Sequence, residues 1–592
     1  MANIPDIPLG LHKDAIAKVV ADMWFKYNQA RQPWLAEKSE LRAFLFATDT
    51  RKTSNNKLPW KNSTVTPKLT QIRDNLHANY MAALFPSENW FQWYSYDKES
   101  ATKEKRETIE AYMRNKLKAS GFELTVSQLV LDYIDYGNVI AGHEYIKELK
   151  SDPVTKEIVN VYTGPKAFRV SPLDCVFDPT AISFDKTPFM YRQLKSLGDL
   201  HNDVNTKPLL GYKKDVFDKA LEMRHSYMDY VDTLKNEGLL VDGFGSLEEY
   251  LASNLVELIH FYGDYFDLST KTLYKDQIIT VIDRRWILRM EENKSWLGER
   301  PFKHCGWRLR PDNLWAQGPL DQLIGMQYRV DHLENLKADV FDQIAHPVIK
   351  IKGSTVEEFE FEPGAEIFCG EEGDVEFLRP DTTALNADMQ IDNLMAKMEE
   401  LAGAPKQAMG IRTPGEKTKY EVQTLENASG RIFQHKVAWF ERNIIEPLIN
   451  SMLEEARRNM ESDELVKVID PDYGVQTFMS ISKNDILARG KLFPIGARHF
   501  AEQARFMQDI THTLQIVNTM PTVAVHISGK AIAQAIEENM GWATYNIVQE
   551  NVALREQAET ERMTKSLQEQ LAVEDQINTG MPNEQATPQI PA

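Results

Sequence analysis

One segment of the chain has the residue types of a phosphate-binding loop. Gly410, Gly415, Lys417 and Thr418 follow the order of the pattern G-x-x-x-x-G-K-[ST], but Glu416 is inserted between the second glycine and the lysine. Such a loop works only when consecutive backbone N–H groups surround the phosphates and the lysine stands at a fixed reach. The insertion shifts that register, the glutamate repels phosphate, and no strand pattern precedes the loop. The sequence therefore argues against nucleotide binding.

A second segment is unusual for its charge. Between Gly353 and Leu378 there is no lysine or arginine, whereas acidic residues are frequent. The acids considered as a docking surface are Glu357, Glu358, Glu360, Glu362, Glu371, Glu372 and Asp374. Such a stretch is compatible with a solvated loop, with a docking surface for a basic partner, or with a wall that repels DNA phosphates.

The usual catalytic and metal-binding signatures are missing from the sequence. It contains no H-E-x-x-H, G-x-S-x-G, G-x-G-x-x-G or EF-hand pattern, and its 13 histidines are scattered. Two acid pairs, 132/135 and 399/400, are expected on helix faces, where solvated charge is the ordinary interpretation. We therefore expect no catalytic residue, no metal and no cofactor.

Composition is that of a folded protein. The 592 residues are 42% hydrophobic and 26% charged, with a net charge of −19. No run approaches the roughly 18 apolar residues of a membrane span, and residues 1–10 lack a signal-peptide pattern, so we expect no membrane partner. Cys175, Cys305 and Cys369 are far apart, which favours reduced, mostly buried thiols over disulfides or zinc. The acidic balance means that any DNA contact should be loose over much of the surface.

Hydrophobic periodicity predicts a mixed α/β region over residues 1–318. Helices are expected at 11–47, 67–84, 101–120, 124–136 and about 196–260, and strands at 140–149, 158–162, 167–170 and between 256 and 290. An aromatic cluster at 90–96 is more typical of a core or subunit interface than of stacked bases. The segment 284–310 interleaves basic residues with tryptophan, and we interpret it as a solvated or intersubunit face.

The central section predicts two helices that bracket a small β excursion. Gly318-Pro319 opens a helix that runs to Ala345. Its apolar stripe consists of Leu323, Met326, Val330, Leu333, Leu336, Val340 and Ile344. Strand candidates follow at 348–351, 366–369 and 375–378, and a second helix runs from the capping residues 381–383 to Gly403. The two helices should lie side by side, with the excursion at one tip.

A loop and a long helix come next. Residues 404–417 are rich in Gly, Pro, Lys and Arg, and Thr418-x-x-Glu421 is a capping box that starts a helix of about 42 residues. Gly430 and Pro447 are its expected kink sites. A mixed stretch covers 464–495, helices are expected at 498–518, 528–540 and 543–572, and the tail 576–592 is expected to be disordered.

In this order of elements the chain resembles the portal proteins of tailed bacteriophages, most of all the larger portals of short-tailed phages. Three segments carry the resemblance: 168–181 (FRVSPLDCVFDPTA), 318–347, and 402–448 with its loop and kinked helix. The resemblance covers roughly residues 60–460. It rests on element order and loosely patterned segments rather than on a catalytic signature.

The resemblance implies an α+β, predominantly helical portal fold. Residues 1–318 and 419–495 would form the wing, 319–345 and 384–403 the two stem helices, 346–383 the clip, 404–418 the tunnel loop and 496–575 the crown. The clip would carry the acidic docking surface. The tunnel loop would face the DNA channel with Lys406, Gln407, Met409, Arg412, Thr413 and Lys417.

The implied function is that of a homododecameric ring at one capsid vertex of the virion, assembled in the host cytoplasm, through which double-stranded DNA enters and leaves. Its partners would be further copies of itself, DNA, the terminase, the major capsid protein and the head-to-tail adaptor. Two alternatives remain. Another structural virion component would lack the bracketed clip and tunnel loop, and a nucleic-acid-dependent ATPase would need the phosphate loop that Glu416 interrupts.

Overall fold

The computed structural model describes residues 12–46, 62–86, 89–96, 103–151, 158–207, 210–224, 254–267, 271–293, 295, 298–346, 348–352, 374–378, 382–403, 432–460, 464–469 and 476–496. The chain divides into two units, one formed by residues 1–466 and 480–501 and the other by 467–479 and 502–592. The first unit mixes helices with antiparallel sheets, which makes it an α+β structure. Among the described helices, none is both long and apolar enough to cross a membrane.

The first described residues form two helices where the sequence predicted one over 11–47. These are α1 (His12–Ala30) and α2 (Gln32–Phe46), and they meet at Arg31. The prediction overlooked Pro33, which has no N–H and whose ring conflicts with the carbonyl group one turn earlier. The single helix therefore breaks just before this proline, and the side chain of Arg31 becomes available at the corner.

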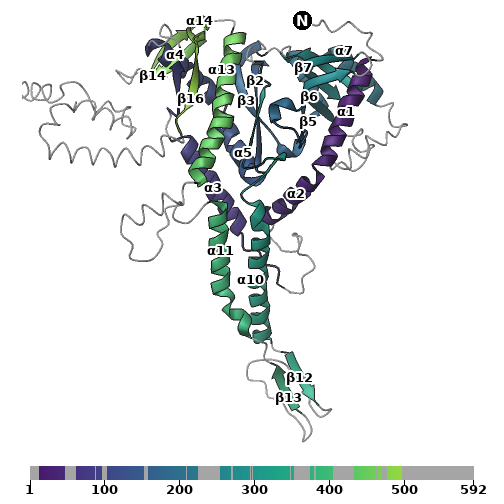
Figure 1. Cartoon of the computed structure of the whole chain (residues 1–592), viewed down its shortest axis with the longest axis vertical. Coiled ribbons are helices and arrows are strands. Elements are labelled where there is room, and N and C mark those ends of the chain that lie inside the picture. Colours follow the sequence, from purple (N-terminus) through teal and green to yellow (C-terminus); the bar gives the residue numbers. More distant parts are fainter. Residues whose placement is uncertain are drawn as a thin grey trace, which may run out of the picture. The chain divides into compact units, whose positions relative to one another are not determined.

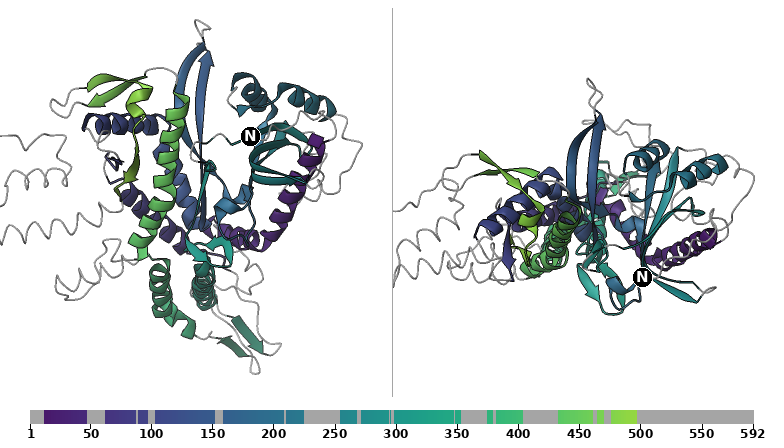
Figure 2. Two further views of the ribbon diagram at one scale, coloured as in Figure 1. Left: turned by 45° about the horizontal axis from the view of Figure 1, so that its top comes forward. Right: turned by 90° about the horizontal axis from the view of Figure 1, so that it is seen from above.

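A five-stranded antiparallel sheet has the order β4-β5-β6-β7-β8. Its strands are β4 (Cys175–Val176), β5 (Phe189–Ser196), β6 (Leu255–Asp267), β7 (Thr272–Ile282) and β8 (Trp286–Glu292). Ile259 and Phe261 of β6 pack on the side of α1, whereas Val256 and Leu258 pack toward α6 (Leu197–Thr206) and α7 (Lys214–Arg224) (Figure 2). Alternate residues of a strand point to opposite faces, so this sheet is covered on both sides.

The prediction of one helical stretch over 196–260 was wrong for its last residues, which form part of this sheet. The first part of that stretch forms α6 and α7, but its last residues belong to β6. A strand that is buried on both faces has a continuous apolar run, which periodicity alone cannot distinguish from a buried helix.

A second sheet has the order β3-β2-β9 and is antiparallel throughout. Its strands are β2 (Asn138–Ser151), β3 (Ile158–Val170) and β9 (Phe302–Gly306). The sheet packs with α4 (Lys103–Ala119) and α5 (Phe122–Asp135), and α3 (Lys68–Leu84) packs on α5. Strands β10 (Arg308–Arg310) and β11 (Asn313–Gln317) form a separate pair. These elements confirm the predicted helices at 67–84, 101–120 and 124–136. The two larger sheets and helices α1–α7 are called the body below.

The aromatic cluster forms a strand of its own. Strand β1 (Phe91–Ser95) pairs antiparallel with β16 (Gly490–Pro494). Trp90, Phe91 and Trp93 are buried, as the core interpretation predicts, but Tyr94 and Tyr96 are exposed. The mixed stretch expected at 464–495 contains β14 (Glu464–Ile469), β15 (Gln476–Ile481), α14 (Lys483–Ile486) and β16.

The central helices have the predicted arrangement. A short turn of 3-10 helix (Asp321–Leu323) leads into α10 (Ile324–Ala345), and a second one (Thr382–Ala387) leads into α11 (Asp388–Ala402). Between them, β12 (Val348–Lys352) and β13 (Asp374–Leu378) pair antiparallel. Figure 1 shows α10 and α11 side by side, with β12 and β13 beyond one end of the pair. We call α10 and α11 the helix pair, and the end next to β12 and β13 its tip. The strand candidate 366–369 lies outside the described residues.

The long helix expected from Thr418 is described only from residue 432 onward. Residues 432–440 are helical, a π-helical turn covers Glu441–Ile445, and α13 (Glu446–Asn459) follows. Pro447 lacks the N–H that would continue a regular hydrogen-bond ladder, and the widened turn directly before it is a common response to such a break. The irregularity therefore falls at one of the two predicted kink sites.

Candidate functional site

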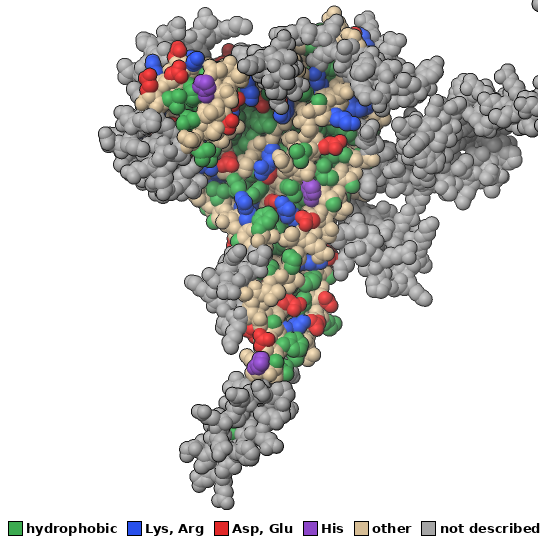
Figure 3. Space-filling model, turned by 180° about the vertical axis from the view of Figure 1, so that it is seen from behind, with side chains coloured by type: hydrophobic (Ala, Val, Ile, Leu, Met, Phe, Trp, Pro, Cys, Tyr) green, Lys and Arg blue, Asp and Glu red, His purple; other side chains and the backbone are tan. Residues whose placement is uncertain are grey.

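The apolar stripe of α10 is buried only where the helix meets the body. Leu323, Val330 and Leu333 are buried, whereas Ile344 near the tip is 44% exposed. Phe341 on the same helix is 55% exposed, and Met389 at the start of α11 is 76% exposed. On the face seen in Figure 3, hydrophobic side chains lie among charged ones along the helix pair. The described part of the chain therefore leaves much of the apolar surface near the tip exposed.

Residues 62–69 run along α10 and are called the strap; residues 62–67 precede α3, and residues 68 and 69 are its first two. Four of its backbone N–H groups donate to helix side chains one turn apart: Asn62 to Asp339 (2.9 Å), Thr64 to Asn335 (2.9 Å), Thr66 to Asp331 (2.9 Å) and Leu69 to Gln327 (3.2 Å). Four residues of helix rise about 6 Å, and two residues of extended chain advance about 6.5 Å. The two repeats match for the three rungs from Asn62 to Thr66. The fourth donor, Leu69, follows three residues after Thr66 and lies in the first turn of α3.

The hydrogen bonds of the ladder are largely buried. At two positions the helix side chain also donates a hydrogen bond back to a carbonyl oxygen of the strap. The Asn335 amide also donates to the Thr64 carbonyl oxygen at 2.8 Å, and the Gln327 amide donates to the Thr66 carbonyl oxygen at 2.5 Å. The Asp331 carboxyl group is part of this buried ladder. Burial raises its pKa to about 6, although hydrogen bonds from the Thr66 N–H and the Gln327 amide oppose the shift. Backbone groups that would otherwise lack partners are thus satisfied by helix side chains.

Two buried lysines fasten the helix pair to the body. Lys38 of α2 pairs with Asp321 just before α10, and Asp321 also accepts a hydrogen bond from the N–H of Gly318 at 2.8 Å. Burial lowers the pKa of Lys38, against the attraction of Asp321. Lys68, in the strap, places its Nζ 2.5 Å from Oε1 of Glu399 on α11. Both helices are therefore anchored at their body end by charges drawn from the first 70 residues.

The solvated interpretation of the acid pairs is wrong for three of the four residues. Asp132 forms two hydrogen bonds with Arg169 (2.5 and 2.7 Å), and Asp135 forms two with Arg73 (2.6 and 2.8 Å). Glu399 is buried against Lys68, as described above. Only the fourth acid, at position 400, is exposed. The helical periodicity placed these acids on faces correctly but could not show which faces the body covers.

The chain leaves α11 and returns to the body at nearly the same point. Gly403 ends α11 in the left-handed conformation (φ +74°), and a methyl group built on it would lie 3.6 Å from Cγ2 of Ile432. The helix that begins at residue 432 contacts the body within its first five residues. Phe433 packs edge-on against Tyr80 at 4.9 Å, and Nζ of Lys436 lies 4.6 Å from the centre of the Trp307 ring. Residues 404–431 are thus an excursion between two adjoining anchors.

The candidate DNA-facing residues lie within that excursion, outside the described residues. These are Lys406, Gln407, Met409, Arg412, Thr413 and Lys417. The acidic candidates Glu357, Glu358, Glu360, Glu362, Glu371 and Glu372 also lie outside them. Asp374 is the first residue of β13, in register with Lys352 of β12. The structure does describe the residues that flank both segments: β12 and β13 around the acidic one, and Gly403 and Ile432 around the basic one.

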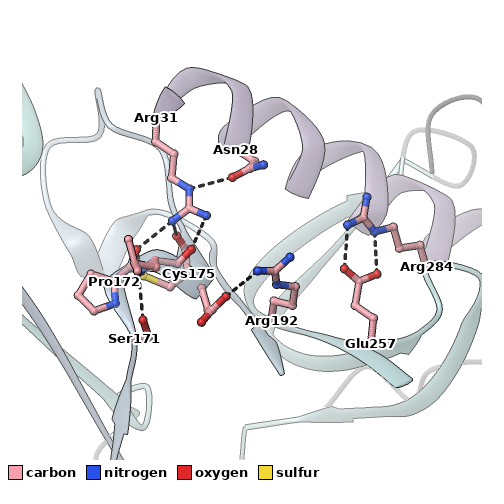
Figure 4. Close-up of polar contacts among 10 residues, drawn as sticks. Asn28, Arg31, Ser171, Pro172, Cys175, Arg192, Glu257 and Arg284 are labelled. Atoms are coloured by element: carbon pink, nitrogen blue, oxygen red, sulfur yellow. Dashed lines mark hydrogen bonds and ion pairs between the residues drawn. The ribbon is translucent and has the colours of Figure 1, made fainter. Parts of the chain in front are cut away.

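The segment 168–181 is a junction between several elements (Figure 4). The Arg31 guanidinium donates to the carbonyl oxygens of Pro172 (2.9 Å), Leu173 (2.7 Å) and Cys175 (2.7 Å). Arg192 of β5 donates to the carboxylate of Asp174 at 2.7 Å. The corner between α1 and α2, the end of β3 and the edge of the five-stranded sheet are held together here.

The basic segment 284–310 is not simply a solvated face. Arg284 is buried and forms two 2.8 Å hydrogen bonds with Glu257 (Figure 4). These bonds join β6, which carries Glu257, to the turn between β7 and β8, where Asp283 and Arg284 both have positive φ. Trp307 is also buried. These residues stabilise the body instead of contacting an external ligand.

Cysteine and metal chemistry add no site among the described residues. Cys175 and Cys305 are free and buried, as predicted, and burial raises the pKa of each thiol to about 12. Cys369 lies outside the described residues. In the part of the chain that the structure describes, no three His, Cys, Asp or Glu side chains gather in a way that could hold a metal ion. No protein-family model matches this chain, and a search of curated proteins finds no significant match.

Proposed function

We propose that this chain is the subunit of a portal-type ring that conducts double-stranded DNA at one vertex of a phage capsid. The observation that carries the proposal is the helix pair, whose apolar stripe is buried at the body and bare toward the tip. A single chain leaves this surface in water, where exposed apolar patches usually mark a contact with another molecule. A closed ring of copies would cover it in every subunit.

The excursion 404–431 supports a channel-lining role. Its ends adjoin at Gly403 and Ile432, so it can project as a loop without changing the path of the flanking helices. Between 404 and 418 the cations are Lys406, Arg412 and Lys417, against the single acid Glu416. A few salt-screened cations per subunit, repeated around a ring, can follow DNA phosphates without holding them tightly.

The hairpin formed by β12 and β13 supports a docking role. It stands at the tip of the helix pair and flanks the acidic stretch 353–373. Negative charge there would steer a basic surface of a terminase motor or of a head-to-tail adaptor. In this proposal the protein binds and conducts but catalyses nothing, and the motor supplies the ATPase.

Electron microscopy of the purified full chain tests the proposal. We expect closed rings with a central channel, in which the helix pairs of neighbouring subunits are adjacent. Particles that remain single subunits or pairs under conditions of assembly would exclude a portal.

A further inference from the structure

Two faces of α10 are already occupied within one subunit. The ladder residues, from Gln327 to Asp339, face the strap, and Val330 and Leu333 are buried on the side toward the body and α11. Arg329 and Leu336 are seven residues apart, two helical turns, so they share a third face. Arg329 is exposed, and Leu336 is half-buried. A neighbouring molecule that contacts α10 must use this third face.

Helix α11 has a single bare face. Ile391, Met398 and Ala402 are buried, and they line one side of the helix. On the opposite side Met389 and Glu400 are exposed and eleven residues apart, three helical turns. Within the described part of the chain, the ion pairs include neither Glu400 nor Arg329. The bare face of α10 therefore offers a cation and the bare face of α11 an anion.

Contacts between the helices fix which residues stand at the same height. Near the tip, Lys337 pairs with Asp388, which puts Leu336 level with Met389. Near the body, the successive strap residues Lys68 and Leu69 contact Glu399 and Gln327, which puts those two helix positions level.

Arg329 and Glu400 are close in height as well. Arg329 lies two residues tipward of position 327 and Glu400 one residue bodyward of position 399, so their Cα atoms differ in height by about 4.5 Å. Helical side chains lean toward the N-terminus of their own helix. That direction is bodyward for Arg329 on α10 and tipward for Glu400 on the antiparallel α11. The two side chains therefore lean toward a common height.

We infer that Arg329 of each subunit pairs with Glu400 of the next subunit, with Leu336 packed on Met389 nearer the tip. The inference rests on the proposed ring. All copies in a closed ring stand at one height, so residues at equal height on two bare faces are the ones that can meet. The occupant of the bare face is thus a second copy of this chain, selected by opposite charge near the body and by apolar contact near the tip.

Charge reversal tests this pair in the full chain. Arg329→Glu and Glu400→Arg each place like charges in every interface of the ring, and we expect each to reduce the ring fraction, measured by native mass spectrometry, at least tenfold. The double variant restores opposite charges and should recover rings. Lys219→Glu and Asp218→Arg, at exposed positions on α7, are the matched controls and should form rings like the wild type.

Mixing the two single variants decides whether the pair forms between subunits. In an alternating ring, every interface again joins opposite charges, so the mixture should form rings although neither variant does alone. A pair within one subunit could not be rescued in this way. Rings from either single variant at the wild-type yield, or failure of both the double variant and the mixture to recover them, would overturn the inference. If the wild type itself forms no ring, the portal proposal fails, and the pair fails with it.

Discussion

Nζ of Lys68 lies 2.5 Å from Oε1 of Glu399, and the two side chains are only 9% and 5% exposed. The strap and the last turns of α11 are more than 300 residues apart in sequence, and this buried ion pair joins them. A buried pair is stable only while both partners are present, because a single charge left in the interior has lost its water without compensation. The body end of the helix pair therefore depends on a polar contact as well as on apolar packing.

Removing one partner of this pair should be costly. Lys68→Met leaves the Glu399 carboxylate buried without its cation, and we expect the free energy of unfolding to fall by about 3–5 kcal/mol. Urea unfolding followed by circular dichroism, at equal protein concentrations, measures the change. Lys219→Met, the same substitution at an exposed position of α7, is the control and should change stability by less than about 0.5 kcal/mol. Equal effects from both variants would contradict the buried role of the pair.

The ladder between the strap and α10 should show its own energetic signature. Asn335→Ala removes both the acceptor for the Thr64 N–H and the donor to the Thr64 carbonyl oxygen, and Asn335 is fully buried. We expect a loss of about 2–3 kcal/mol in unfolding free energy, because two backbone groups lose their partners. Asn202→Ala, at an exposed position of α6, is the matched control. Equal stabilities for the two variants would mean that the ladder contributes nothing.

The same ladder predicts a pH dependence. Burial raises the pKa of Asp331 to about 6, so the folded protein binds this proton more tightly than the unfolded chain does. The stabilisation is complete below the unfolded pKa of about 3.9 and is lost as the pH rises through 6. Urea midpoints of wild type and Asp331→Asn should therefore differ more in favour of the wild type at about pH 5 than at about pH 7.5. A difference that does not change with pH would contradict the raised pKa.

Local sequence patterns were sufficient to predict the helix pair and the two strands described at its tip. The stripe from Leu323 to Ile344, the turn after Ala345 and the glycine stop at Gly403 are local signals, and local signals determine where α10 and α11 begin and end. The break at Arg31 was also present in the sequence, as Pro33, but the strong apolar pattern on both sides concealed it.

The ladder of hydrogen bonds between the strap and α10 could not be predicted in the same way. Gln327, Asp331, Asn335 and Asp339 recur every four residues, but a polar stripe on a helix normally faces water, and nothing local indicates that residues 62–69 cover it. The buried ion pairs of Asp132, Asp135 and Glu399 could not be predicted for the same reason. Each depends on an arginine or lysine far away in sequence.

The proposed tunnel loop leads to a prediction about DNA. Replacing Lys406, Arg412 and Lys417 by Gln should weaken binding of double-stranded DNA and flatten its salt dependence, because each phosphate contact releases counterions. Filter binding over a range of salt concentrations gives the slope. Glu416→Gln removes the only acid between 404 and 418 and keeps every cation, so it should bind DNA at least as tightly as the wild type. Unchanged affinity and slope in the triple variant would show that the loop does not contact DNA.

The proposed function requires a closed ring of subunits, and the mass of the assembled protein shows whether that ring forms. Native mass spectrometry of the purified full chain should give a single closed species, with twelve copies as the number that the portal resemblance implies. A mass of one or two chains at every protein and salt concentration would rule out the ring, because the apolar surface near the tip of the helix pair would then have no neighbour to cover it.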